Sequence, residues 1–145
     1  MYTCKPLSSA ETYLVRHPVL RPGKPFDTCL FVGDDWPSTK HFGIFHHDTV
    51  IGVLSLFVQT NPLFSHENQL QFRGMAVLSE YQNKGIGAQL MAYAETQLTT
   101  PRPVLIWLNA RLKAITFYEK MGYHKIGEPF TIGDIGIHYV MCKMS

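Results

Sequence analysis

Hydrophobic and polar residues follow a helical spacing near the N-terminus, and the spacing then changes to the two-residue alternation of strands. Residues 7–19 predict a short helix that begins near Ser8 or Ser9, with Glu11 in its first turn as the partner of the cap. We expect this helix to end before Pro18, because a proline inside a helix removes a backbone hydrogen bond.

Strand patterns dominate the next part of the chain. Residues 40–46 and 50–59 are rich in β-branched and aromatic side chains, and the polar residues 47–49 between them predict a hairpin. Residues 69–78 alternate like a third strand. Gly74 lies inside that pattern, which predicts a bulge or a close approach of another segment to the backbone.

The second half of the chain alternates between helices and strands. Apolar residues in 86–98 recur at helical spacing and predict a helix, whereas the continuous apolar run 104–108 predicts a strand covered on both faces. Residues 112–121 predict a second helix closed by Gly122. Two short strands are expected to follow, at 123–128 and 138–143.

The predicted order is one helix, three strands, a helix, a strand, a helix and two strands. This order is typical of an α/β or α+β fold with a mixed sheet. The chain has 145 residues, and domains commonly have about 150, so we expect a single domain over residues 1–145. Hydrophobic residues make up 46% and charged residues 17%, a composition that excludes intrinsic disorder.

Charge, hydropathy and cysteine content narrow the class of protein. The formal net charge of +2 is too small to predict a nucleic-acid partner. No apolar run approaches the roughly 20 residues that span a bilayer, and no signal-peptide pattern is visible, so we expect no membrane partner. The three cysteines are far apart in the sequence, which argues against disulfides and zinc and predicts packed, reduced thiols in a cytoplasmic protein.

One glycine-containing segment carries the strongest chemical signal. It consists of Gln82, Asn83, Lys84, Gly85, Ile86, Gly87 and Ala88, between a predicted strand and a predicted helix. Helix N-termini present unpaired N–H groups and the positive end of the dipole, and they bind phosphate or pyrophosphate. The spacing fits neither a Walker loop nor a dinucleotide fingerprint, because Leu90 stands where a third glycine would fall. Taken alone, the segment fits a structural turn better than a phosphate site.

Two segments together resemble the Gcn5-related N-acetyltransferase (GNAT) family. The first is the strand end Met75-Ala76-Val77 followed by residues 82–88, which fit the family pattern of Arg or Gln, two residues, Gly, one residue, and Gly or Ala. The second is 114–123, in which Phe117-Tyr118 is followed after three residues by Gly122-Tyr123. The resemblance extends from about residue 40 to the C-terminus and is poor over residues 1–39.

The resemblance implies a fold, a donor and an acceptor. The fold would be a mixed, mostly antiparallel sheet with splayed central strands flanked by helices. Acetyl-CoA would be the acyl donor and a primary amine of a small molecule, amino acid or peptide the acceptor, with no metal. The backbone of Met75, Ala76 and Val77 would pair with the pantetheine arm like an added strand, and residues 82–88 would hold the pyrophosphate. A homodimer is compatible with the family.

The family's reaction is direct attack of a neutral amine on the thioester carbonyl. It needs a route for the amine's proton and an acid for the departing thiolate. Tyr118 matches the position of the family's usual acid, and a phenol with a pKa near 10 can return a proton to a thiolate. The alternative is a packing role beside Phe117. One of the two rings must point to the core, and the family pattern favours Phe117.

The sequence departs from the family pattern seven residues before the tyrosine. Many members carry an asparagine there that contacts the CoA arm, whereas this chain has Arg111, with Asn109 two residues earlier. Either side chain could contact the cofactor. Asn109 could equally bond to the local backbone.

A second departure concerns the general base. Some members carry a glutamate on the strand that corresponds to 104–108, and this strand has no acidic residue. The base is therefore elsewhere or is water, and the candidates are Glu67, His66 and His138. We favour His138, which follows a glycine-rich loop expected on the acceptor side. The alternative is an exposed or hydrogen-bonded strand histidine.

Other conspicuous residues have simpler interpretations. His46-His47-Asp48 fits the polar tip of a hairpin better than a metal site. The phenylalanines at 42, 45, 57 and 72 are expected in the sheet core. Residues 26–39 predict a loop, in which Trp36 could line an acceptor pocket or simply fill the loop.

These observations together predict an acetyl-CoA-dependent N-acetyltransferase. One alternative is a catalytically inactive acyl-CoA-binding sensor of the same fold. The other is a phosphate-binding structural domain with no role in acyl transfer.

Overall fold

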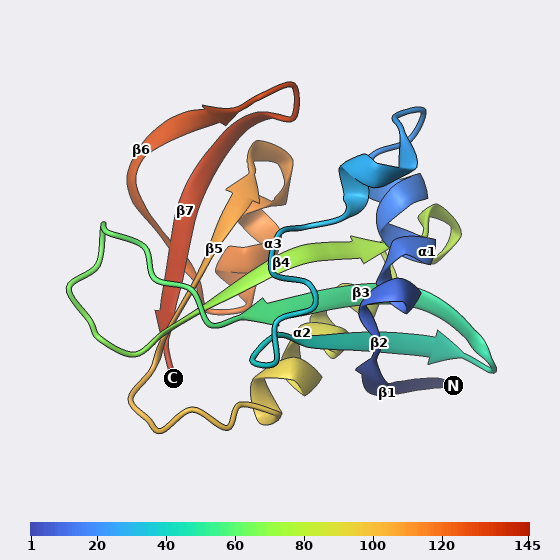
Figure 1. Cartoon of the computed structure of the whole chain (residues 1–145), viewed down its shortest axis with the longest axis horizontal. Coiled ribbons are helices and arrows are strands. Elements are labelled where there is room, and N and C mark those ends of the chain that lie inside the picture. The colour runs from blue at the N-terminus through green and yellow to red at the C-terminus, as the bar shows by residue number, and fades with distance from the viewer. The chain divides into compact units, whose positions relative to one another are not determined.

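The computed structural model describes residues 1–145 and contains seven strands and three α-helices (Figure 1). The strands are β1 (Tyr2–Leu7), β2 (Lys40–His46), β3 (Thr49–Phe57), β4 (Gln69–Val77), β5 (Leu105–Arg111), β6 (His124–Ile132) and β7 (Gly136–Met144). The helices are α1 (Ser9–Leu20), α2 (Ile86–Thr96) and α3 (Ile115–Lys120). The strand order is β1-β2-β3-β4-β5-β7-β6, with β4 and β5 parallel. The predicted mixed sheet, mostly antiparallel and accompanied by helices, is confirmed.

The chain groups into two compact units. The N-terminal unit comprises residues 1–57 and 73–99, and the C-terminal unit comprises residues 58–72 and 100–145. Strand β4 begins in the C-terminal unit and ends in the N-terminal unit, with the boundary after Phe72. One domain over the whole chain stays a prediction.

Helix α1 begins as its sequence predicts. The Ser8 side chain accepts a hydrogen bond from the Glu11 N–H, and the Glu11 carboxylate accepts one from the Ser8 N–H at 2.9 Å, which completes a capping box. The predicted end before Pro18 is wrong, because the helix continues to Leu20. Pro18 lies in the last turn, where it removes a single bond, and the Arg21 N–H still closes the helix on the His17 carbonyl at 3.1 Å.

Strand β1 was not predicted from the sequence. It pairs antiparallel with β2, from Tyr2 opposite His46 to Leu7 opposite His41, and it forms one edge of the sheet. Its side chains are exposed or only partly buried and it contains Pro6, so it lacks the apolar alternation that marks a strand.

Helices α1 and α2 cover opposite faces of the N-terminal unit's strands. Val15 of α1 packs with Val53 of β3. Leu54, the next residue of β3, is paired with Phe42, whose ring lies 5.8 Å from that of Tyr93 on α2. Successive side chains of a strand point to opposite faces, so the two helices lie on different sides. The four phenylalanines expected in the core are 1–7% exposed, as predicted.

Gly74 is the site of a close approach, as its position in the strand pattern predicts. Its φ is +68°, and an added Cβ would lie 2.9 Å from the Phe31 ring and 3.1 Å from Arg16 Nε. A side chain at this position would therefore displace Phe31 or Arg16.

The C-terminal unit has its own small core. Its buried residues are Leu105, Trp107, Val140 and Cys142, with Phe64, Ile126 and Phe130 packed against them. Strand β7 pairs with β5 on one side and β6 on the other. The predicted strands at 123–128 and 138–143 are confirmed and are longer than expected. Gly122 follows α3 with φ +96°, the left-handed conformation expected of a residue that closes a helix.

None of the helices has both the length and the apolar character needed to cross a membrane. No group of three or more histidine, cysteine, aspartate or glutamate side chains is placed to hold a metal ion. All three cysteines are unpaired, and Cys29 and Cys142 are buried. Burial raises the pKa of both thiols, which makes them unreactive packing groups.

Candidate functional site

The glycine segment forms a tight entry into helix α2. Asn83 and Gly85 both adopt left-handed backbone conformations, with φ of +62° and +77°. Gly85 is the N-cap of α2 and provides no capping side chain. Two left-handed residues so close together turn the chain sharply from the loop into the helix, which glycine permits at little steric cost.

The first turn of α2 leaves backbone donors without helical partners. The first ladder bond runs from the Gln89 N–H to the Gly85 carbonyl at 3.1 Å, so the N–H groups of Ile86, Gly87 and Ala88 have no acceptor within the helix. A Cβ added at Gly85 would meet nothing within 4 Å, which shows open space at the cap. These features fit an anionic group such as a pyrophosphate.

Two polar side chains of the segment have defined surroundings. Gln82 donates from Nε2 to the Val77 carbonyl at 2.8 Å, which ties the loop to the end of β4. Lys84 is exposed, with Nζ 5.7 Å from the centre of the Tyr81 ring. Gln82 therefore holds the loop in place, and Lys84 adds a positive charge one residue before the N-cap Gly85.

At the strand end Met75–Val77, the groups that a ligand could contact are those of the backbone rather than the side chains. Ala76 is 3% exposed and packs with Val15 and Val53 in the core. The register between β4 and β5 runs from Gln69 to Gln71 and does not extend to Met75–Val77, where the Val77 carbonyl already accepts the hydrogen bond from Gln82. Any ligand contact here would use main-chain groups, as β-augmentation does.

Tyr118 lies on the short helix α3 of the C-terminal unit. Its ring meets Phe117 edge-on at 5.0 Å and lies 6.2 Å from Tyr123. Burial raises the pKa of its hydroxyl to about 12, and the charge of Arg111 opposes the rise. Tyr118 therefore stays protonated at neutral pH and can act as a hydrogen-bond donor.

The sequence interpretation of α3 needs one correction. Phe117 was expected to point to the core in preference to Tyr118, but both side chains are half-buried. The buried residue of the helix is Ile115. The sequence did not identify Ile115 as the buried residue, because a helix of six residues is too short to show a clear apolar period.

The end of β5 carries the two residues expected near the CoA arm. The Asn109 side chain is half-buried and makes no hydrogen bond, so the alternative of a bond to local backbone is not realised. Arg111 lies opposite His138 in the register and is close enough for its charge to act on the Tyr118 hydroxyl.

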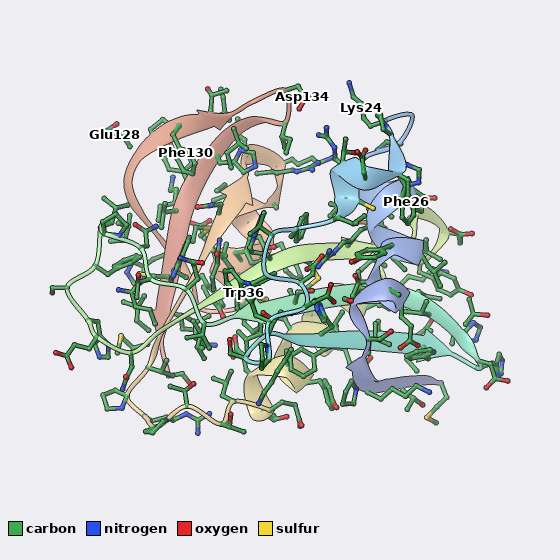
Figure 2. All side chains as sticks on the ribbon, in the orientation of Figure 1. Lys24, Phe26, Trp36, Glu128, Phe130 and Asp134 are labelled. Carbon is green, nitrogen blue, oxygen red and sulfur yellow. The ribbon has the colours of Figure 1, made fainter.

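His138 is 4% exposed and lies near the start of β7. Its Nδ1 lies 2.8 Å from the Gly136 carbonyl oxygen, and since a carbonyl can only accept, Nδ1 carries the proton. The neutral ring then has its lone pair on Nε2, the atom a general base needs. Figure 2 labels Phe130 of β6, whose ring lies 6.0 Å from that of His138.

The other two candidate bases have weaker cases. His66 binds the Asn68 carbonyl through Nδ1 at 3.0 Å but is less buried than His138, and Glu67 is exposed. Neither side chain is enclosed by the protein as that of His138 is. Trp36, labelled in Figure 2, is 44% exposed and packs over Gly33, so it fills its own loop.

A buried polar network in the N-terminal unit was missed by the sequence interpretation. Arg16 is fully buried on α1 and binds both carboxylate oxygens of Asp34, at 2.7 and 3.0 Å. It also donates to Ser55 Oγ at 2.9 Å, and His41 lies 2.6 Å from the same oxygen. These residues are far apart in the sequence, and only the fold brings them together.

Comparisons with known proteins agree with this arrangement. The model of the family described as "Acetyltransferase (GNAT) family" matches residues 10–123. The chain is 35% identical over 143 residues to the uncharacterized N-acetyltransferase YitI of Bacillus subtilis strain 168, covering 99% of this chain and 96% of that protein.

Solved structures share the fold at lower identity. An aminoglycoside 6'-N-acetyltransferase complexed with coenzyme A superposes with a TM-score of 0.77 at 13% identity, over 98% of this chain and 96% of that one. The ribosomal-protein-S18-alanine N-acetyltransferase of Escherichia coli superposes with a TM-score of 0.74 at 18% identity, over 99% and 94%.

Proposed function

The chain belongs to the GNAT acetyltransferase family and is an N-acetyltransferase, and from that premise we propose that it moves an acetyl group from acetyl-CoA to a primary amine. The acceptor would be a small molecule, an amino acid or a peptide. The observation that carries the proposal is the uncapped, glycine-lined start of α2, with the N–H groups of Ile86, Gly87 and Ala88 unpaired.

The N-terminal unit would bind the donor. The pyrophosphate of acetyl-CoA would accept hydrogen bonds from the first turn of α2, with Asn83 and Gly85 shaping the loop and Lys84 adding charge. Gln82 would hold that loop against β4. The pantetheine amides would bond to the backbone of Met75–Val77. The coenzyme A complex of the aminoglycoside enzyme supports this choice of donor.

The reaction would be direct attack of the neutral amine on the thioester carbonyl. The new C–N bond forms and the C–S bond breaks, the amine loses one proton, and coenzyme A leaves as a thiolate that takes its proton from solvent. His138 Nε2 would accept the amine's proton, since the Gly136 carbonyl keeps Nδ1 protonated. Tyr118 would donate toward the departing sulfur. Asn109 and Arg111 would contact the CoA arm.

The raised pKa of Tyr118 shapes its proposed role. A phenol with a pKa of about 12 remains protonated, so the donor is present across the physiological range. Complete transfer to an ordinary thiolate, with a pKa of roughly 8.5, would be uphill. Tyr118 would therefore stabilise the leaving thiolate chiefly through a strong hydrogen bond, and transfer becomes easier where the thiolate is desolvated as well.

A cytoplasmic location and the choice of acceptor class are also part of the proposal. Three unpaired cysteines favour a reducing compartment. The two solved relatives named above differ in acceptor, an aminoglycoside and a ribosomal-protein alanine, so this fold serves small and large amines alike.

An amine panel tests the proposal. The protein is incubated with acetyl-CoA and a broad set of amines, free thiol release is followed, and acetyl-CoA binding is measured by calorimetry. Turnover with at least one amine supports the proposal. Tight acetyl-CoA binding with no turnover favours the sensor, and protection from heat by nucleotides but not by CoA favours a phosphate-binding structural domain.

A further inference from the structure

Arg73 is a partly buried cation that has no anionic partner in the protein. It lies on β4, its guanidinium makes no hydrogen bond or ion pair, and its stem is half-buried. Burial lowers its pKa, and the charge of Arg16 lowers it further, while Asp34 opposes the shift. A guanidinium has five N–H donors, and buried cations are normally paired.

Two aromatic rings hold the Arg73 guanidinium in place. Its Cζ atom lies 4.4 Å from the centre of the Phe31 ring and 5.2 Å from that of Phe57. Stacking of this kind fixes a planar guanidinium and leaves its N–H edge available for an acceptor. The side chain is thus ordered before any ligand arrives, which lowers the entropy cost of binding.

The Asp34 carboxylate, whose charge acts on Arg73, is already bonded to other donors. Asp34 already accepts from both terminal nitrogens of Arg16 and from the Phe31 N–H at 2.9 Å. Arg16 also lies over Phe31, 3.8 Å from its ring centre, and its buried Nε has no hydrogen-bond partner. Two cations therefore share one aromatic ring, and the single buried carboxylate is committed to one of them.

The position of Arg73 connects it to the donor site proposed above. Arg73 precedes Met75 by two residues on β4, a separation of roughly 7 Å or less at the usual rise of a strand. If the backbone of Met75–Val77 binds the arm that carries the acetyl group, a small acceptor can bind Arg73 through one group and present its amine to the thioester.

We propose that Arg73 binds a carboxylate of the acceptor, so that the preferred substrates are amines that also carry a carboxylate, such as amino acids or short peptides with a free C-terminus. The inference rests on the proposed acetyl transfer. A planar guanidinium matches a carboxylate through two parallel hydrogen bonds. Polycationic amines would be disfavoured, because they would meet an unneutralised arginine.

Matched acceptors test this inference. Acetylation rates are measured at saturating acetyl-CoA for dipeptides with a free C-terminus and for the same dipeptides as C-terminal amides, with spermidine as a polycation. The ratio of kcat/KM between acid and amide is compared among the wild type, Arg73→Gln, Arg73→Lys and Lys5→Gln. Comparing ratios between proteins cancels the intrinsic difference in amine reactivity.

The wild type should prefer the acid, and Arg73→Gln should reduce the acid-to-amide ratio at least about 10-fold, the range of a lost charge-assisted pair. Arg73→Lys should restore part of the ratio, because it keeps the charge without the planar fork. Lys5→Gln is the matched control: Lys5 lies over Phe45 at 4.3 Å in the same unit, and its loss removes one charge and one ring contact. The ratio should not change in this variant.

An equal ratio in wild type and folded Arg73→Gln, or a preference for spermidine, overturns the inference while leaving acetyl transfer intact. If no amine is acetylated, the proposed function fails, and calorimetry with an N-acetyl dipeptide and its amide still decides the carboxylate site. Tighter binding of the acid by the wild type than by Arg73→Gln supports the site; equal binding overturns it.

Discussion

Arg16 and Asp34 form an almost completely buried ion pair, with exposed side-chain fractions of 0% and 4% and a shortest N–O distance of 2.7 Å. The pair joins α1 to the loop before β2, and Arg16 extends the link to Ser55 on β3. Three segments of the N-terminal unit therefore share one polar junction. Removing either Arg16 or Asp34 leaves the charge of the other buried in the core without a partner.

Removal of the arginine is expected to destabilise the protein strongly. Arg16→Met keeps most of the side-chain volume but leaves the Asp34 carboxylate buried without its partner, which costs about 3–5 kcal/mol in comparable cases. Urea denaturation followed by circular dichroism measures the loss. Asp27→Asn, an exposed acid of the same loop, is the control and should change stability by less than about 0.5 kcal/mol. Equal losses for the two variants would show that the pair is energetically neutral.

Because of the Asp34 carboxylate, we expect the free energy of unfolding to fall in acid. Burial alone would raise the pKa of Asp34, but the hydrogen bonds from Arg16 and the Phe31 N–H outweigh it and hold the pKa below its usual 3.8. The unfolded chain then binds the proton more tightly than the folded one. The stabilisation is complete above pH 5 and declines as the pH falls through about 4 toward the lower pKa of the folded state.

A comparison of wild type and Asp34→Asn between pH 7 and pH 3 isolates this contribution. The free energy of unfolding of the wild type should fall more steeply with acid than that of the variant. Glu11, whose pKa is also lowered by its hydrogen bonds to Ser8, is present in both proteins and cancels in the difference. Parallel pH profiles would contradict the prediction.

The sequence predicted most elements of this fold for a local reason. Strand alternation, the Ser8–Glu11 cap and the glycine that closes α3 are each encoded within a few residues. Strand β1 was not predicted, because an exposed edge strand needs no apolar face. The end of α1 was predicted too early, because a proline in the last turn of a helix removes only one hydrogen bond.

The buried Arg16–Asp34–Ser55 network and the unpaired Arg73 could not be predicted from the sequence, because they depend on tertiary structure. Arg16 and Ser55 are separated by 39 positions in the sequence, and no spacing rule relates them. The stacking of Arg73 on Phe31 and Phe57 depends in the same way on the path of the loop before β2. Motifs identified the glycine segment and Tyr118, but whether a charge is paired is decided by the fold.

A glutamate at position 87 tests the proposed pyrophosphate site. Gly87→Glu places a side chain and a negative charge in the first turn of α2, where the unpaired N–H groups would bind acetyl-CoA. Acidic residues there favour the helix, so the variant should fold. Acetyl-CoA affinity measured by calorimetry should fall at least about 100-fold, the scale of a few lost charge-assisted bonds.

Gln89→Glu is the control for charge in the same turn, since Gln89 is exposed and its N–H is already bonded to Gly85. It should weaken binding far less than Gly87→Glu. Unchanged affinity in folded Gly87→Glu would exclude the helix start as the pyrophosphate site.

Substitution of His138 separates the acceptor side from the donor side. His138→Ala should lower kcat or raise the KM for the amine while sparing acetyl-CoA binding. His138→Asn is the sharper variant, because its amide can still donate to the Gly136 carbonyl as Nδ1 does, while the basic Nε2 is lost. It should show the same catalytic loss with a smaller change in stability.

Steady-state kinetics with each substrate varied in turn, together with acetyl-CoA calorimetry, distinguish the outcomes. A loss confined to acetyl-CoA binding would place His138 with the donor instead. Full activity in His138→Asn would leave it only the packing role suggested by its contact with Phe130.

Tyr118→Phe removes the proposed donor and keeps the ring contacts with Phe117 and Tyr123. A packing tyrosine would tolerate this change, because its hydroxyl makes no hydrogen bond in the protein. A hydrogen-bond donor to the leaving thiolate would not tolerate it, and the loss of one such preorganised donor costs roughly 10²–10³-fold in rate. We expect kcat to fall at least about 10-fold, a lower bound set by the ability of water to substitute. Acetyl-CoA affinity and folding should change little.

Because the pKa of Tyr118 is about 12, the wild type should also show no alkaline loss of activity from this group below about pH 10. Rapid-quench measurements establish whether chemistry limits the rate, and a variant that then turns over at the wild-type rate would return Tyr118 to a structural role.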